Sequence, residues 1–240
     1  MILGRRAALF GLAAASMPVA PVLGAASAEP DRLAFKVLRN GSQIGTHVLS
    51  FRRAAGSLTI GIEVDIDFKL GPISLYKYRL RGTEIWGGGT LMSLTSKTDD
   101  DGKADFVEAS RDDKGFWVSS SSGPRYLAPS ESLPATHWNA AEMRGPWIDP
   151  QHGKLTRPTV APARRTMVRL PSGRDVEADH FVLTGEVKME VWYTPDGAWT
   201  YLKAPARDGS TISYDLMGQV GGGAADKKSP MVGNIPQSER

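Results

Sequence analysis

The stretch LTIGIEVDIDFKL, Leu58 to Leu70, alternates apolar and polar residues without interruption. Because successive side chains of a β-strand point to opposite faces of the sheet, this period of two predicts a long strand with one apolar face. The apolar residues are Leu58, Ile60, Ile62, Val64, Ile66, Phe68 and Leu70. At about 3.3 Å per residue the strand would span about 43 Å, whereas typical strands have about five or six residues. Such a length favours a large, twisted and curled sheet whose apolar face must be covered.

The same alternation recurs along most of the chain, with turn residues between the segments. Asn40-Gly41 and Asp101-Gly102 suit the tight turns of β-hairpins. Short turns between successive strands indicate an antiparallel meander. Strands and helices do not alternate along the chain, so a parallel sheet is not expected. The expected strands cover residues 33–39, 43–53, 58–70, 73–86, 91–100, 104–113, 116–121, 165–170, 176–185, 187–194, 198–205 and 210–217.

Residues 121–163 interrupt this pattern with a stretch rich in Pro, Ser and Ala. Within it, PATHWNAAEMRG predicts one short helix, with Thr136 as its N-cap and Gly145 at its end. The fold class is therefore mainly β, a curled antiparallel meander or half-barrel with one short helix in the middle insertion.

The first 28 residues have the pattern of a signal peptide. Two arginines precede an apolar stretch, and Ala26-Ser27-Ala28 fits a cleavage site before Glu29. Arg5-Arg6 also loosely resembles a twin-arginine signal, so the export route stays open between the two pathways. We expect a periplasmic protein with a signal peptide at 1–28, a single β domain at 29–216 and a flexible C-terminal tail at 217–240.

Charge and composition narrow the classes of partner. Without Arg5 and Arg6 the mature chain has 27 basic and 26 acidic residues, so we expect no nucleic-acid partner. The apolar part of the leader is shorter than the roughly 20 residues that span a bilayer, so no transmembrane segment is expected in the mature chain. The sequence contains no cysteine, which excludes disulfides and thiol chemistry.

The FKVLRNGSQIGTHVLSF hairpin, the long meander and the late MEVWYTPDGAW hairpin carry a family resemblance. Together with the leader they make the chain resemble an uncharacterised family of exported bacterial β proteins. That family is similar in architecture to the curled sheets of the LolA and LolB lipoprotein carriers, which enclose an apolar cavity. The resemblance implies a lipid or lipoprotein ligand.

Aromatic residues on the strands, together with the His137-Trp138 pair in the insertion, are the candidates for contacting a ligand. Ligand sites combine an apolar lining with a few polar groups, although core packing explains the same aromatic residues. For Trp138 the alternative is a plug at one end of the sheet, with Thr136 and Asn139 binding helix-start amides. The candidate residues are Tyr76, Tyr78, Trp86, Trp117, His137, Trp138 and Trp192.

No catalytic residue, metal ligand or cofactor is predicted. The four histidines lack the spacing of a metal site, and the strand position of His47 is compatible with a side chain in solvent. Alternating acids at 63–67 face alternating bases at 77–81, which predicts solvated cross-strand ion pairs rather than catalytic acids. An enzyme reading would gain if His137 lay within hydrogen-bond reach of a carboxylate such as Asp149.

The sequence therefore favours a non-catalytic periplasmic protein that binds a hydrophobic molecule, such as a lipid or a lipoprotein acyl chain. An envelope scaffold or interaction protein, with an interior filled by its own side chains, is the alternative. A hydrolase acting on the envelope is the third class.

Overall fold

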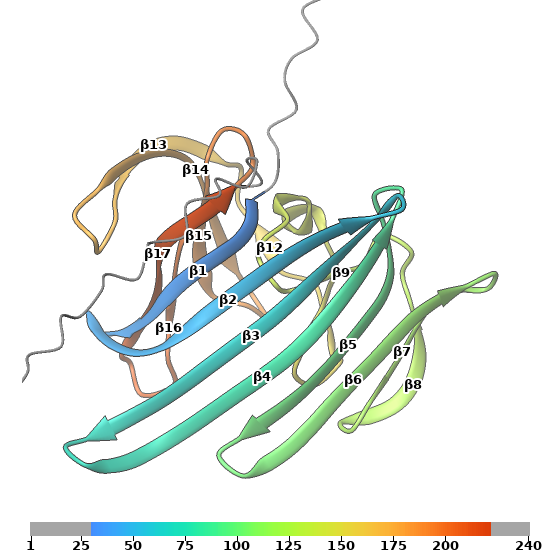
Figure 1. The fold of residues 1–240 in the computed structure, drawn as a ribbon, viewed down its shortest axis with the longest axis horizontal. Helices are drawn as coiled ribbons and strands as arrows, with labels where there is room; N and C mark the ends of the chain where they lie inside the picture. Colours follow the sequence, from blue (N-terminus) through green and yellow to red (C-terminus); the bar gives the residue numbers. More distant parts are fainter. Residues whose placement is uncertain (1–29, 222–240) are drawn as a thin grey trace, which may run out of the picture.

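The computed structural model describes residues 30–221 (Figure 1). One short three-stranded sheet, a 3-10 helix and the loops aside, these residues form one large antiparallel sheet. The signal peptide expected at 1–28 lies outside the described residues, as do residues 222–240 of the expected tail. Within residues 30–221 no helix has the length and apolar character needed to cross a membrane.

The large sheet has 14 strands and is confirmed as a curled, unclosed antiparallel sheet. Its first half is a meander of β1 (Pro30–Arg39), β2 (Ser42–Ala54), β3 (Ser57–Leu70), β4 (Ile73–Gly87), β5 (Thr90–Asp100), β6 (Lys103–Asp112), β7 (Gly115–Ser120) and β8 (Gly123–Ala128). The second half is β12 (Thr159–Val160), β13 (Arg164–Arg169), β14 (Asp175–Thr184), β15 (Met189–Tyr193), β16 (Trp199–Pro205) and β17 (Thr211–Gly221). Every strand expected from the alternation is present.

The first and last strands join the two halves. β1 pairs with β2 on one side and with β17 on the other, so the sheet order runs from β12 through β14–β17 and β1 to β8. β17 continues to Gly221, five residues past the expected domain end at 216, because its pairing with β1 extends that far. One edge of the sheet is β8, and the other is formed by β12 and β13, which both pair with β14.

The segment between β8 and β12 lies behind the sheet in Figure 1 and covers its concave face. It contains β9 (Leu133–Pro134), a 3-10 helix η1 (Ala140–Arg144), β10 (Trp147–Ile148) and β11 (Leu155–Thr156). We call residues 129–158 the middle segment. Its side chains Met143, Trp147 and Ile148 belong to the same buried cluster as the inner faces of the strands.

The helix predicted in this segment differs from the observed one. η1 has five residues, and its N-cap is Asn139, whose side chain accepts a hydrogen bond from the Ala141 amide. Thr136 is not the cap, because its hydroxyl donates instead to Glu84 on β4. The predicted end at Gly145 is confirmed.

The apolar face of β3 is buried over only part of its length. Ile60, Ile62 and Val64 are at most 7% exposed, whereas Leu70 is 68% exposed. The prediction that the whole face is covered is therefore wrong. Figure 1 shows the physical reason, since the β3–β4 hairpin projects beyond the rest of the molecule.

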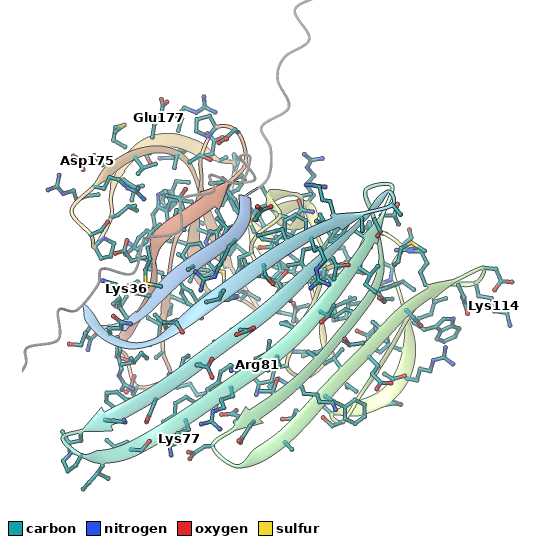
Figure 2. The ribbon with its side chains drawn as sticks, viewed as in Figure 1. Lys36, Lys77, Arg81, Lys114, Asp175 and Glu177 are labelled. Atoms are coloured by element: carbon teal, nitrogen blue, oxygen red, sulfur yellow. The ribbon has the colours of Figure 1, made fainter. Side chains whose placement is uncertain are left out.

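The opposite face of the hairpin carries the predicted ion pairs. Arg81 Nη2 donates to both carboxylate oxygens of Asp65, at 2.8 and 2.7 Å, and Arg79 Nε lies 4.0 Å from Asp65 Oδ1. Figure 2 shows Lys77 and Arg81 on the face of the sheet turned toward the viewer. These pairs are solvent-exposed, which confirms the prediction of solvated cross-strand ion pairs.

One glycine of β2 is required by close backbone packing. A Cβ on Gly45 would lie 2.1 Å from the carbonyl oxygen of Asp65 on β3, so the two strands would have to separate. We expect Gly45→Ala to lower the free energy of unfolding by about 1–3 kcal/mol, the usual cost of overpacking. Gly123→Ala is the control, because a Cβ there meets nothing within 4 Å. Urea unfolding of both variants measures the difference, and equal stability would contradict this packing.

Candidate functional site

A cavity of about 230 Å³ lies on the concave side of the sheet, between the β3–β4 hairpin and the middle segment. We call it the interior cavity. Three of the candidate ligand residues, Tyr76, Tyr78 and His137, come together at its wall. The complete lining is His47, Ile62, Val64, Ile66, Tyr76, Tyr78, Leu80, Ala135, Thr136, His137, Pro150 and Tyr214.

The strand register explains this grouping. Val64 pairs with Leu80 and Ile66 with Tyr78, and residues directly opposite on two strands project from the same face. The same face continues toward the hairpin turn through Phe68 opposite Tyr76 and Leu70 opposite Ile73. We call Phe68, Leu70, Ile73 and Tyr76 the hairpin strip. Leu70 and Ile73 are 68% and 62% exposed, so an apolar surface leads from solvent to the cavity.

The cavity is electrically neutral on its tyrosine side. Burial raises the pKa of Tyr78 far above its usual value, and burial also raises the pKa of Tyr214 to about 12. Burial and then a hydrogen bond to Asp100 raise the pKa of Tyr76. These hydroxyls therefore remain protonated at neutral pH.

His47 is a buried residue of this cavity, so the idea that it faces solvent is wrong. It is 5% exposed and contacts the rings of Trp199 and Tyr214 at centroid distances of 5.4 and 5.7 Å. Burial, and secondarily the charge of His137, lower the pKa of His47 to about 3. Its imidazole is neutral at pH 7.

His137 enters the cavity from the middle segment in a strained backbone conformation, with φ of 66°. Its Nδ1 lies 2.7 Å from Glu142 Oε1, and its amide donates to Glu142 Oε2 at 3.1 Å. The Tyr193 hydroxyl donates to the same carboxylate at 3.1 Å. The carboxylate therefore orients the imidazole ring through Nδ1, and Nε2 lies outside this pair.

His137 lies within hydrogen-bond reach of a carboxylate, which is the geometry that would favour an enzyme. The carboxylate is that of Glu142 and not that of Asp149. Asp149 instead pairs with His152, at 2.9 Å. A carboxylate-oriented imidazole is half of a nucleophile-activating arrangement. Among residues 30–221, no serine or threonine hydroxyl hydrogen-bonds to His137. The pair therefore orients a ring at the cavity wall.

Trp86 and Trp138 lie at a second buried carboxylate, that of Glu84 on β4. Glu84 is fully buried and accepts hydrogen bonds from Thr136 Oγ1 at 2.6 Å, Trp86 Nε1 at 2.7 Å and Trp138 Nε1 at 3.0 Å. These bonds attach the middle segment to the sheet. The two indoles also line a separate depression of about 580 Å³ near the β2–β3 and β4–β5 turns.

Trp117 and Trp192 lie on the outer face of the sheet. Trp117 is flanked on β7 by the buried Phe116 and Val118, and Arg125 lies over its ring at 4.4 Å. Trp192 stacks on His180 with a centroid distance of 4.3 Å. A larger depression, of about 750 Å³, also lies on this face across β3–β6, where charged residues alternate with Thr side chains.

The described residues offer no metal centre. Among residues 30–221, no group of three or more histidine, cysteine, aspartate or glutamate side chains is close enough to hold an ion.

Comparison with known proteins places the chain in a family. Residues 35–217 match the model of a domain of unknown function, DUF6134. The chain belongs to the DUF6134 family. The matched DUF6134 range runs from β1 to β17, so it includes both halves of the sheet, the middle segment and every residue of the interior cavity. No curated protein matches the chain.

A solved structure of a protein from another family has a similar fold. The chain is similar to a β-barrel-like protein of a domain of unknown function, DUF1849, from Brucella abortus. The match covers 82% of this chain and 99% of that chain, with a TM-score of 0.52 and 14% identity. At this identity the likeness concerns the fold alone, and it agrees with the curled β architecture expected from the sequence.

Sequence reasoning missed three residues of this DUF6134 interior. His47 shares the inward parity of Leu49 and Phe51, and Glu84 shares that of Leu80 and Trp86, so alternation alone could have placed both inside. Glu142 lies in the irregular segment, where no period predicts which side chains turn inward. The parity of Trp117 and Trp192 likewise indicates the outer face.

Proposed function

We propose that this protein is an exported, non-catalytic binding protein of the bacterial envelope that takes the apolar part of a ligand into the interior cavity. The observation that carries the proposal is the cavity itself, whose apolar wall continues into the exposed hairpin strip. Ligand pockets combine such an apolar lining with a few polar groups, which His47, His137 and the tyrosines supply here.

The volume limits what can be enclosed. An apolar cavity of about 150 Å³ holds benzene, and drug-sized ligands need about 300–1,000 Å³. A cavity of about 230 Å³ therefore suits one small ring or a short chain. A longer acyl chain fits with only its end inside and its remainder along the hairpin strip, where Leu70 and Ile73 are exposed.

An envelope scaffold is the second candidate, and the filling of the interior favours it. Phe35, Trp147 and Trp199 are at most 1% exposed and are among the largest fully buried side chains of the described residues. In that case the exposed hairpin strip would contact a protein partner and the interior cavity would have no ligand.

Filling the cavity separates the two candidates. Ile66→Trp adds an indole at the cavity wall, so we expect it to weaken binding of toluene, an apolar probe of suitable size, at least about tenfold. Ile85→Trp is the matched control, because Ile85 lies on the outer face of β4, is 41% exposed and lines no part of the cavity.

Toluene titrations followed by NMR of the methyl groups of Ile62, Val64 and Leu80 measure this binding. Saturable shifts in the wild type and in Ile85→Trp, but not in Ile66→Trp, support a ligand-binding protein. Absence of saturable toluene binding in the wild type would contradict the ligand-binding function, and the envelope scaffold would then be the remaining candidate.

A further inference from the structure

His47 has hydrogen-bonding capacity that the protein does not use. It is 5% exposed, yet neither Nδ1 nor Nε2 has a hydrogen-bond partner among the described residues. A buried polar group without a partner costs about 1–3 kcal/mol, so orphaned groups in native structures call for an explanation. Both unpartnered nitrogens belong to a side chain that lines the interior cavity.

Trp199, whose ring contacts that of His47, also has an unused hydrogen-bond donor. Trp199 Nε1 is also buried without a partner among the described residues, and its ring lies 5.4 Å from that of His47. The His137 ring lies 5.5 Å from the same indole, and its Nδ1 is bound to Glu142. The rings of His47 and His137, which both line the cavity, thus lie on the same buried indole.

We infer that the interior cavity selects a small apolar molecule that carries a hydroxyl group, such as a phenol or a short alcohol, and that His47 hydrogen-bonds this hydroxyl. The inference rests on the proposed binding function and adds the ligand's chemical class and a specificity-determining residue. It assigns the remaining wall, Ile62, Val64, Ile66 and Leu80, to the ligand's hydrocarbon body.

The lining argues for a neutral ligand. None of its side chains is an aspartate, glutamate, lysine or arginine, so the lining has no permanently charged group to balance a carboxylate or an ammonium group. A neutral imidazole has one N–H donor and one acceptor nitrogen. A hydroxyl group both donates and accepts, so it can bond either nitrogen, and its oxygen can accept from a neighbouring donor.

Phenol and toluene test the inference, because they have the same shape and differ by a hydroxyl in place of a methyl group. We expect the wild type to bind phenol about tenfold more tightly than toluene, the gain from a hydrogen bond to an otherwise unpaired buried group. In His47→Leu the two affinities should become equal, with toluene binding retained. Ser50→Ala, on the exposed face of the same strand, should keep the wild-type preference.

A second readout on the wild type does not depend on the variant. The ring 15N resonances of His47 should shift when phenol is added and stay unchanged with toluene. Equal affinities for the two probes, or phenol binding without a response of the His47 nitrogens, would overturn the hydroxyl assignment and leave the binding function standing. Binding of neither probe would overturn the binding function and this inference with it.

Discussion

Acid should unfold this protein through His47. As the pH falls from 6.5 to about 3, we expect the free energy of unfolding to drop by up to about 5 kcal/mol from this residue alone. The pKa of His47 is lowered to about 3 in the folded protein, mainly by burial, from 6.5 in the unfolded chain. Between these values the unfolded chain binds one more proton than the folded protein. The stability contribution is therefore present above pH 6.5 and lost below it.

His47→Leu isolates this effect, because leucine cannot titrate. Urea unfolding at several pH values between 7 and 3.5, followed by tryptophan fluorescence, should show a much smaller acid loss in His47→Leu than in the wild type. Ser50→Ala on the same strand, exposed and non-titrating, should keep the wild-type slope. An unchanged slope in His47→Leu would mean that the buried imidazole accepts a proton without unfolding.

The opposite pH dependence is expected from Glu84. Burial raises its pKa to about 7, against the opposing hydrogen bonds from Thr136, Trp138 and Trp86. Since the unfolded value is about 4.5, the folded protein holds a proton between pH 4.5 and 7 that the unfolded chain has lost. The stability contribution is complete below pH 4.5 and is lost as the pH rises through 7, by about 3 kcal/mol.

His47 and Glu84 oppose each other between pH 4.5 and 6.5, so the Glu84 effect is best measured in the His47→Leu background. There we expect the free energy of unfolding to fall by about 3 kcal/mol from pH 4.5 to 7.5. Adding Glu84→Gln, which keeps the shape and removes the titration, should remove that fall. A fall of the same size in the double variant would show that another group causes it.

The strands could be predicted because each depends on local information. A period of two places Leu58 to Val64 on one face, and the left-handed Asn40-Gly41 pair, with φ of 48° and 84°, fixes the hairpin between β1 and β2. The middle segment could not be predicted in the same way. Its path depends on contacts with β4 and β15, such as Thr136 with Glu84 and Tyr193 with Glu142.

Parity decided which candidate residues reach the interior cavity. Tyr76 and Tyr78 have the inward parity of β4, whereas Trp117 and Trp192 have the outward parity of their strands. Choosing residues by aromatic character alone therefore mixed the two faces. The same rule applied to polar residues would have pointed to His47 and Glu84, whose burial is costly enough to mark a special position.

The pairing of β1 with β17 has a consequence for biosynthesis. Pro30 lies opposite Gly221, so β1 can complete its backbone hydrogen bonds only after β17 has emerged. Contacts between such distant parts of a chain slow folding, and an unfinished strand edge can pair with another molecule. A nascent chain of this kind stays open to chaperones, or to aggregation, until β17 has been made.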